Sequence, residues 1–532
     1  MFRLRKRQLP DPQGRHLRRH LQHLPDQVQP AHVRDLRQLR RDLQHLPYLR
    51  DPLWYLQYLR HLQPPHPGMP VLMAAPIIVE PTSATRATGW RPVLRGVEAV
   101  AAIDTATTVA RRVFDPQVRA AATARAAGQS GYPESIHWQP VDIAQGDAGL
   151  ALLAGALDDI QPGAGWDAVA HRSLNAAADQ AGRAVWSARL YGGLAGLAFA
   201  ALRASHGGAR YRRMLASLDA VIAEQVVPQA ASLAAQTEGM SVSDFDVISG
   251  ITGTGAYLLA RTAQESAGPE VDVAVRGVLR ALVTLTTPIG GRQRWRTPHD
   301  LIGDPTMIEA FPHGTLNCGL AHGIPGPLAL MSLALTAGYE IPGLPESIER
   351  TAGWLLEHRV DDRWGPNWPT VLPTAPNGRE DLAHRQQPGR AAWCYGAPGV
   401  ARAVSLAGLA LGDSRLVDLA AQAMLAVHDR PSPVRAIDGP GLCHGGAGLA
   451  QVTLRMAADT GREDLAAAAA AVARDLVAEF DPESMLGYSS LEPGDVRVEQ
   501  PGLLEGATGV ALTLLAAAAP ADPGWDRILL LS

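Results

Sequence analysis

Two of the three cysteines and two of the histidines occupy matching places in a repeated glycine motif. Cys394 and Cys443 each lie two residues before the first glycine of a Gly-x-x-Gly motif, and His322 and His444 each lie one residue before one. Two thiolates and one imidazole are three of the four ligands that tetrahedral zinc takes in proteins. Three protein ligands leave a fourth position for water or substrate, which is typical of a catalytic site. The pattern therefore predicts a catalytic zinc site formed by Cys394, Cys443 and His444.

The alternative is that these cysteines are small buried core residues, as most free cysteines are. The shared position in the motif and the adjoining histidine favour metal binding. Three cysteines in 532 residues exclude a disulfide framework and indicate a reducing compartment. No apolar run follows the basic N-terminal residues, and no stretch reaches the roughly 18 apolar residues of a membrane span. We therefore expect a cytoplasmic protein.

Helices must position these residues. From about residue 95, Ala/Leu/Val/Arg-rich segments alternate with loops that contain Gly and Pro, and alternating strand patterns are scarce. Predicted helices include 98–114, 117–127, 149–157, 166–183 and 194–204. A Gly-x-x-Gly motif followed by an apolar helix occurs seven times, with first glycines at Gly146, Gly193, Gly250, Gly323, Gly396, Gly445 and Gly506. The steps of 47, 57, 73, 73, 49 and 61 residues each hold two helices, which is typical of a helix-hairpin repeat.

Seven hairpins can stack as an open solenoid or close into a double ring of inner and outer helices. Closure is favoured because neither terminal repeat looks like a polar cap. In a closed ring, equivalent positions face a common centre. Position −1, directly before the first glycine, holds in chain order Gln145, Gly192, Ser249, His322, Tyr395, His444 and Glu505. The predicted fold class is all-α, an α/α toroid, and the ring would bring Cys394, Cys443 and His444 together.

Charge and composition set the N-terminal part apart. Residues 1–68 hold 12 Arg, 1 Lys and 5 Asp, a net charge of +8, so the remainder carries −12 of the total of −4. We expect 1–68 to be a wrongly assigned extension, with Met69 or Met73 as the real start; the alternative is a basic arm that contacts anionic partners or membrane. The predicted division is extension 1–68, linker 69–94 and toroid 95–532.

Several motifs carry a family resemblance. Residues 317–326, Asn-Cys-Gly-Leu-Ala-His-Gly-Ile-Pro-Gly, closely resemble the Asn-Leu-Gly-Leu-Ala-His-Gly-Ile-Pro-Gly signature of lanthionine synthetase C proteins. Residues 393–399 (Trp-Cys-Tyr-Gly-Ala-Pro-Gly) and 442–445 (Leu-Cys-His-Gly) are similar to the family's two zinc motifs, and 246–250 (Asp-Val-Ile-Ser-Gly) to its Asp-Val-Ile-Glu-Gly segment. The resemblance covers about 135–532 and implies an α/α toroid of seven hairpins. Cys318 and Ser249 depart from the family pattern; Cys318 lies outside the ligand positions and is expected to be a buried core thiol.

The resemblance implies one zinc per chain, held by Cys394, Cys443 and His444. It also implies a reacting centre lined by His322, Asp246, Arg390 and Tyr395. The implied enzyme is a zinc-dependent carbon–sulfur bond-forming cyclase of the lyase class, active in lantibiotic biosynthesis. It adds a peptide cysteine thiol to dehydroalanine or dehydrobutyrine and forms a (methyl)lanthionine thioether ring. A free thiol has a pKa of about 8.5, so the metal would supply the thiolate.

The lining residues have expected roles and structural alternatives. His322 is expected to transfer the proton that the enolate needs, because imidazole titrates near neutral pH. Asp246 would orient His322 or take the thiol proton; its alternative is a helix N-cap. Arg390 would stabilise the enolate oxygen or the substrate backbone, with a solvated surface arginine as the alternative. Tyr395 is either a second acid or a ring packed beside the zinc. His313, His384 and Trp393 are expected to support the site.

Other functions remain open. The same residues would serve a related enzyme that adds glutathione or another thiol to dehydrated residues, and a non-catalytic zinc scaffold within a modification complex is a further alternative. A zinc-bearing protein prenyltransferase type is disfavoured because its ligand set includes a carboxylate. The expected partners are a dehydrated precursor peptide as substrate, a separate dehydratase and a transporter. The chain would associate with membrane only through a complex with such partners. No phosphate-binding loop, dinucleotide fingerprint or nucleic-acid motif occurs.

Overall fold

The computed structural model describes residues 89–383, 386–437 and 439–532. The predicted extension 1–68, most of the predicted linker 69–94, and His384 lie outside these residues. Within the described part, helices dominate and the strands are few and short.

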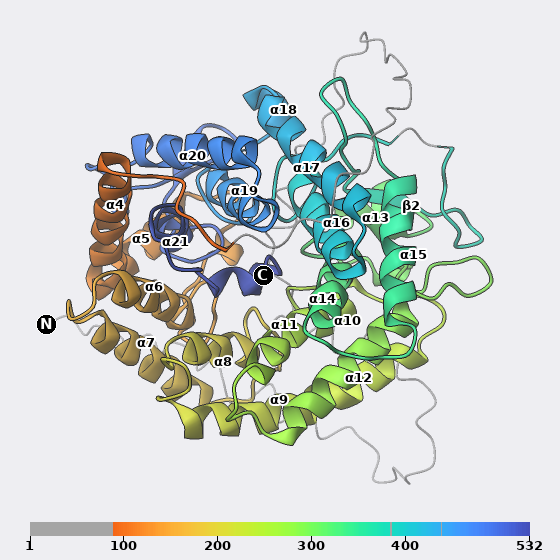
Figure 1. Ribbon diagram of the computed structural model, residues 1–532, viewed down its shortest axis with the longest axis horizontal. Coiled ribbons are helices and arrows are strands. Elements are labelled where there is room, and N and C mark those ends of the chain that lie inside the picture. The colour runs from red at the N-terminus through yellow and green to blue at the C-terminus, as the bar shows by residue number, and fades with distance from the viewer. Residues whose placement is uncertain (1–88, 384–385, 438) are drawn as a thin grey trace, which may run out of the picture. The chain divides into compact units, whose positions relative to one another are not determined.

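Apolar helices form the inner ring of the toroid (Figure 1). Seven are found in the described part: α6 (Asp147–Ile160), α8 (Leu194–Arg203), α11 (Ile251–Thr262), α14 (Pro325–Thr336), α16 (Ala397–Leu411), α19 (Gly446–Thr460) and α21 (Ala507–Ala518). These helices carry small and apolar residues on all their faces. All 12 residues of α21, for example, are buried. A helix that is apolar all round is stable only in a core. Each glycine motif leads into one inner helix, as the sequence predicts, but the helix begins inside the motif, one or two residues after its first glycine.

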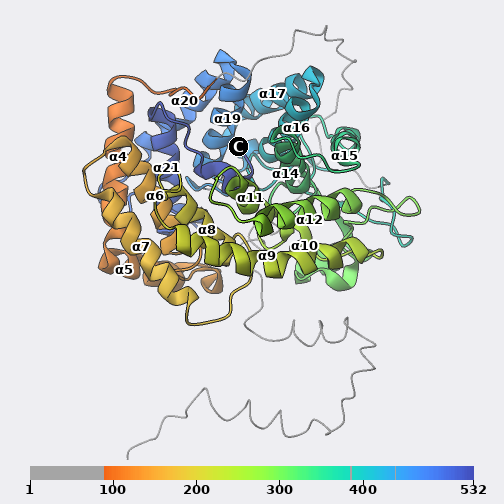
Figure 2. The ribbon, with the colours of Figure 1, turned by 60° about the horizontal axis from the view of Figure 1, so that its bottom comes forward.

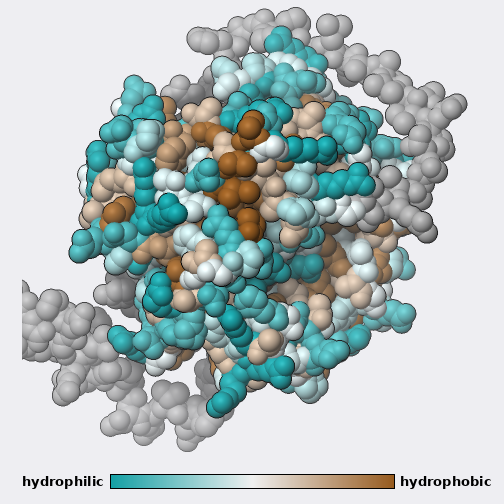
Figure 3. Space-filling view, turned by 60° about the vertical axis from the view of Figure 1, so that its left-hand side comes forward, coloured by the Kyte–Doolittle hydropathy of each residue, from teal (hydrophilic) through white to brown (hydrophobic). Residues whose placement is uncertain are grey.

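Amphipathic helices form the outer ring. They are α4 (Val97–Phe114), α7 (Trp166–Ala181), α9 (Arg212–Ala235), α12 (Pro269–Leu285), α15 (Leu344–Glu357), α17 (Ser414–Asp429) and α20 (Glu463–Ala478). In α12, the buried residues Val271, Val275, Val278 and Leu282 recur every three or four positions and face the inner ring. Figure 3 shows the side of the molecule on which α4 lies: hydrophilic side chains cover most of it, and a patch of hydrophobic residues crosses its middle.

The ring is closed. Each inner helix contacts the next one along the chain, and α21 contacts α6 as well as α19. The outer partner of α21 is α4, the first helix described, and the N–H groups of Val93 and Leu94 donate to the carbonyl of Ala517 at 2.9 and 3.0 Å. The predicted α/α toroid of seven hairpins is therefore confirmed. Its seventh hairpin is assembled from the two ends of the described chain, which the repeat spacing does not predict.

The C-terminal segment fills the centre of the ring. The short 3-10 helix η4 (Trp525–Leu529) lies among the inner helices in two views (Figures 1 and 2). Its backbone accepts hydrogen bonds from opposite sides of the ring: Tyr191 Oη donates to the carbonyl of Ile528 (2.9 Å) and Trp393 Nε1 to that of Leu529 (2.9 Å). The buried carboxylate of Asp526 pairs with Arg455 of α19 at 2.6 Å. The last residues therefore connect several repeats through one central plug.

The other elements are the 14-residue helix α5 and several short segments. They are α5 (Pro116–Gln129), η2 (Pro133–Ser135), α10 (Val242–Phe245), η3 (His299–Leu301), α13 (Pro305–Ala310), α18 (Ser432–Arg435), β1 (Thr315–Asn317), β2 (Val371–Pro373), β3 (Ser490–Glu492) and β4 (Val496–Val498). β1 pairs antiparallel with β2, with Leu316 opposite Leu372, and β3 pairs with β4. Strands are scarce, as predicted. Among the residues described, the helices are either too short or too polar to cross a membrane.

The second glycine of each motif is required by a close approach of two backbones. A Cβ atom added at Gly448 would lie 1.9 Å from the carbonyl oxygen of Leu442, and one at Gly399 would lie 2.1 Å from that of Trp393. The same contact, with the carbonyl six residues earlier, recurs at Gly149, Gly196, Gly253, Gly326 and Gly509. The motif therefore holds the loop that carries positions −1 and −2 directly against the start of the inner helix.

Replacing Gly448 with alanine is expected to lower the stability of the protein by on the order of 3 kcal/mol, because the backbone must move to admit the methyl group. The thermal unfolding midpoint would measure the loss. The matched control is Gly277→Ala in α12, where no atom lies within 4 Å of the added Cβ. That change should raise stability by roughly 0.5–1 kcal/mol. Equal midpoints for the two variants would contradict the steric role of the motif.

Candidate metal centre

A belt of backbone hydrogen bonds connects neighbouring repeats at position −2. The N–H of Ala321 donates to the carbonyl of Cys394 (3.4 Å), and the N–H of Cys394 donates to the carbonyl of Cys443 (3.2 Å). The N–H of Cys443 donates in turn to the carbonyl of Leu504 (3.0 Å). An equivalent bond runs from Tyr191 to Ile248 (3.3 Å), and Leu503, one residue before position −2, donates to the carbonyl of Ala144 (2.6 Å). The belt is the physical reason that residues 49 positions apart in sequence meet at one place.

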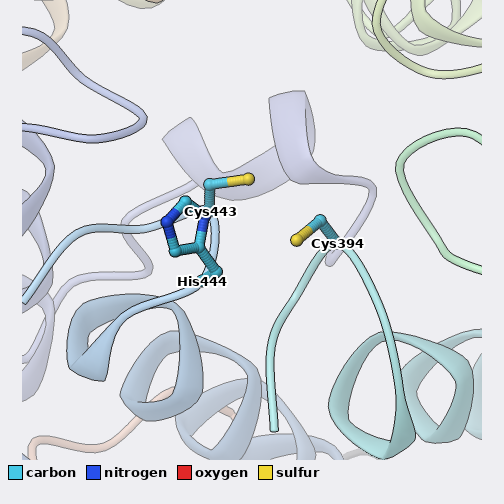
Figure 4. Close-up of side chains that lie close together, drawn as sticks. All are labelled: Cys394, Cys443 and His444. Carbon is cyan, nitrogen blue, oxygen red and sulfur yellow. The ribbon is translucent and has the colours of Figure 1, made fainter. Parts of the chain in front are cut away.

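Cys394, Cys443 and His444 form one cluster. Their potential ligand atoms all lie within 4.8 Å of one another. Cys394 is carried by the loop before α16, and Cys443 and His444 by the loop before α19; the two sulfur atoms point toward each other (Figure 4). Both thiols are buried, and His444 is half-buried. The convergence expected from the shared position is present in the fold.

The cluster is electrostatically suited to a cation. Burial raises the pKa of the Cys443 thiol well above its ordinary value, and the neighbouring Cys394 thiol and the Glu505 carboxylate raise this pKa further. Two thiolates so close together in a buried place require a positive charge to offset their repulsion and desolvation. Cys318 lies outside the cluster and is 1% exposed; burial raises its pKa, and its Sγ lies 3.6 Å from the carbonyl oxygen of Leu316. It is a core thiol, as expected.

His322 and Asp246 form a close pair, and the residue before His322, Ala321, is hydrogen-bonded to Cys394 in the belt. Nδ1 of His322 lies 2.5 Å from Oδ2 of Asp246, although the residues are 76 positions apart. The other carboxylate oxygen accepts the N–H groups of Ser249 and Gly250, both at 2.7 Å. Asp246 therefore stabilises the turn before α11 with one oxygen and orients His322 with the other. The alternative role of Asp246 as a helix N-cap is wrong, because α11 begins at Ile251 with Gly250 as its N-cap and without a side-chain cap.

Comparisons with known proteins identify the family of the chain. The model of the lanthionine synthetase C-like protein family matches residues 137–530. The chain belongs to the lanthionine synthetase C-like family. This family member is 26% identical to the nisin biosynthesis protein NisC of Lactococcus lactis subsp. lactis over 263 residues. That match spans 49% of the chain and 60% of NisC, less than two thirds of the relative's length.

A solved structure, described as nisin cyclase, has the same fold. The TM-score is 0.64 at 22% sequence identity, and the match covers 77% of this lanthionine synthetase C-like protein and 96% of the solved chain. At this level of identity the likeness concerns the fold. Together with the family match, it supports the closed toroid of seven hairpins.

Tyr395 occupies the −1 position between His322 and His444 in the chain. Its side chain is fully buried, and its ring centroid lies 6.4 Å from that of His322. Nδ2 of Asn317 donates to Tyr395 Oη at 3.2 Å, while Oδ1 of Asn317 accepts the N–H of Gly319 at 3.0 Å. Asn317 thus holds in place both the start of the 317–326 segment and the side chain of Tyr395. The fold brings Tyr395 beside the His322–Asp246 pair.

The other sequence-predicted residues have structural contacts of their own. Arg390 donates from a terminal guanidinium nitrogen to the carbonyl of Ala436 (2.5 Å), which ties the loop before α16 to the end of α18. Trp393 is fixed by the plug, through its hydrogen bond to the Leu529 carbonyl. The carbonyl of His313 accepts a hydrogen bond from Thr374 Oγ1 (2.6 Å). The contacts of Arg390 and Trp393 fix the loop that carries Cys394, whereas the exposed His313 contributes only a backbone carbonyl, to Thr374.

Two features of the site were not predicted from the sequence. Glu505 lies beside the cluster, with Oε1 3.3 Å from Nδ1 of His444. Its −1 position in the seventh repeat was a usable signal. The plug around Leu529 carries no such signal, because its contacts are backbone carbonyls that any residue can supply.

Proposed function

We propose that this protein is a zinc-dependent lanthipeptide cyclase. It adds peptide cysteine thiols to dehydroalanine or dehydrobutyrine and forms thioether rings, a carbon–sulfur bond-forming reaction of the lyase class. The observation that carries the proposal is the convergence of the potential ligand atoms of Cys394, Cys443 and His444 within 4.8 Å. The His322–Asp246 pair supports it, because the loop of His322 is hydrogen-bonded to that of Cys394. Family membership and the name of the relative NisC support the same activity.

The donor set fits zinc. Two thiolates and one imidazole are ligands that zinc, a borderline-soft ion, accepts in a tetrahedral site, and three protein ligands leave one position for the substrate. Burial, the Cys394 thiol and the Glu505 carboxylate raise the pKa of Cys443, and a bound cation would offset these effects. When bound, zinc supplies the stabilisation of the incoming substrate sulfur as a thiolate. We propose one zinc per chain.

His322 is proposed to transfer the proton that the addition reaction requires. Attack of sulfur on the β-carbon forms the carbon–sulfur bond, breaks the carbon–carbon π bond and leaves an enolate, whose α-carbon must gain a proton. The thiol loses one proton and the α-carbon gains one, so the reaction is balanced. Asp246 accepts from Nδ1 of His322 and thereby directs Nε2, on the opposite side of the ring, toward proton transfer.

Tyr395 and Arg390 are proposed to assist. Because Asn317 donates to Tyr395 Oη, the phenol keeps its own proton for another acceptor, which makes Tyr395 a candidate second acid. Arg390 is proposed to stabilise the enolate oxygen or the substrate backbone. The proposed substrate is a precursor peptide dehydrated by a separate enzyme in the cytoplasm, with a transporter as a further partner.

A thiol-alkylation assay tests the activity. Synthetic peptides with one cysteine and one dehydroalanine at several spacings would be incubated with the zinc-loaded protein. They would then be treated with iodoacetamide, and their masses would be measured by mass spectrometry. Ring formation conserves mass and consumes the free thiol, so we expect unalkylated product at the starting mass. Peptides with alanine in place of dehydroalanine are the control and should stay fully alkylatable.

A parallel incubation with glutathione distinguishes the related activity. A mass increase of one glutathione, with the peptide cysteine still alkylatable, would replace cyclisation by addition of an external thiol. No reaction at any spacing, by protein that carries zinc, would contradict both activities and favour a scaffold.

A further inference from the structure

The central plug, residues 525–532, contacts the segment that carries Cys394 at two places. Trp393, directly before Cys394, donates from Nε1 to the carbonyl of Leu529 at 2.9 Å. Arg402, on α16, donates from Nε (3.0 Å) and from Nη2 to the carbonyl of Leu531. Trp393, Arg402 and both leucines are at most 1% exposed. The plug therefore holds the chain on both sides of the Cys394 ligand.

The same plug is attached to α19, the inner helix that follows the second ligand loop. The buried carboxylate of Asp526 accepts hydrogen bonds from Nε2 of Gln451 (2.7 Å) and from Nε of Arg455 (2.6 Å). Arg402 adds a direct connection between the two helices, because its Nη1 lies 2.6 Å from Oδ2 of Asp459, near the end of α19. Both inner helices that follow the ligand loops are thus fixed to one central segment.

Tyr191 contacts the plug from the opposite side of the ring. Its Oη donates to the carbonyl of Ile528 at 2.9 Å. Burial raises the pKa of Tyr191 well above its ordinary value, and the charges of Cys443 and Asp142 raise this pKa further. The phenol is therefore within electrostatic reach of the Cys443 sulfur, and the plug lies near the second ligand as well as the first.

The belt fixes the backbone of Cys394 and Cys443, but the place of each sulfur also depends on how firmly the flanking residues are held. Ligands that are held in place before the metal arrives bind it more tightly, because little conformational freedom is lost on binding. We propose that the plug is a positioning element of the metal centre: the carbonyl of Leu529, through the indole of Trp393, sets the place of the Cys394 sulfur. The inference rests on the proposed zinc function. The C-terminal residues thus take part in metal binding without supplying a ligand.

Zinc affinity of the full-length protein tests the proposal without any substrate. Trp393→Phe keeps an aromatic ring but loses the N–H group, and it is expected to weaken zinc binding by about 10-fold, measured by competition with a chromophoric chelator. The matched control is Trp368→Phe, because Trp368 is equally buried and donates from Nε1 to the carbonyl of Leu355 (2.7 Å) on the outer helix α15. Both variants should lower the thermal unfolding midpoint by similar amounts, but the control should bind zinc like the wild type.

Arg402→Lys is a second variant, which tests the plug even if Trp393→Phe does not fold. Lysine keeps a cation for Asp459 but loses the two-nitrogen contact with the carbonyl of Leu531. It should weaken zinc binding by a smaller factor than Trp393→Phe.

Cobalt substitution supplies a readout that a loss of stability alone does not change. At saturating cobalt, Trp393→Phe should alter the intensities of the visible and thiolate-to-cobalt bands, because one sulfur has lost its fixed place. The spectrum of Trp368→Phe should match that of the wild type. Wild-type zinc affinity or a wild-type cobalt spectrum in Trp393→Phe would overturn the proposal, as would an equal loss of affinity in Trp368→Phe.

Failure of the positioning role is distinguishable from failure of the proposed function. A wild type that binds one zinc, beside variants of unchanged affinity, keeps the proposed function intact and removes only the role of the plug. A folded wild type that binds no zinc would overturn the proposed function, and the positioning role with it.

Discussion

Cys443→Ala is expected to lose its zinc. The wild type should carry about one zinc per chain, and the variant should carry a small fraction of that after dialysis against a weak chelator. The reason is that the variant keeps only one sulfur and one imidazole as protein ligands. Two protein ligands are too few to retain the metal during dialysis. Elemental analysis of purified protein measures the content directly.

The third cysteine supplies the matched control. Cys318 is as buried as Cys443, but it lies outside the cluster. Cys318→Ala should therefore keep about one zinc and lose roughly 1 kcal/mol of stability from the small cavity. Zinc retained by Cys443→Ala, or lost by Cys318→Ala, would show that the cluster is not the metal site.

The fold should survive the loss of metal in Cys443→Ala. The contacts of residue 443 in the belt, with Cys394 and Leu504, are made by backbone atoms that the substitution leaves in place. The variant should thus unfold cooperatively at a midpoint close to that of the metal-free wild type. Added zinc should raise the midpoint of the wild type and leave that of the variant unchanged, because a ligand stabilises only the state that binds it.

The cluster could be predicted from the sequence because one local signal marks every repeat. Each second glycine permits the same backbone approach, such as that between Gly448 and Leu442, so residues counted back from the motif occupy equivalent places in the ring. Cys394 and Cys443 share one such place, whereas Cys318, which does not, is a core residue. The toroid followed from the same motif, since its copies are spaced to hold two helices each.

The repeats predicted a closed ring, but they did not show which helix completes the seventh hairpin or that a plug fills the centre. The outer partner of α21 is α4, about 400 positions earlier in the chain, and a pairing of apolar faces at that distance has no local signature. The plug is held largely through its own carbonyls, such as those of Ile528 and Leu529. Glu505 occupies position −1 of the seventh repeat, which the sequence does show. The sequence does not show which neighbouring side chain its carboxylate contacts.

His322→Asn is expected to slow ring formation by about 10²–10⁴-fold while zinc content stays at the wild-type level. Asparagine keeps a hydrogen-bonding group near Asp246 but cannot exchange a proton with the enolate at neutral pH. The rate of loss of alkylatable thiol in single-turnover assays measures the effect, and elemental analysis of the same sample measures the metal. His171→Asn, an exposed substitution on the outer helix α7, is the matched control and should leave the rate unchanged.

Asp246→Asn separates orientation from proton transfer. The asparagine oxygen can still accept the N–H groups of Ser249 and Gly250, so the turn before α11 should persist. Its amide nitrogen would then face Nδ1 of His322 and donate to it, which moves the ring proton to Nε2 and reverses the tautomer. We expect a loss comparable to that of His322→Asn, and no larger loss in the double variant, because the two residues act as one unit. Additive losses would instead give Asp246 a separate task, such as accepting the thiol proton. A wild-type rate in His322→Asn would move the acid role to Tyr395, and loss of zinc from that variant would make His322 a ligand.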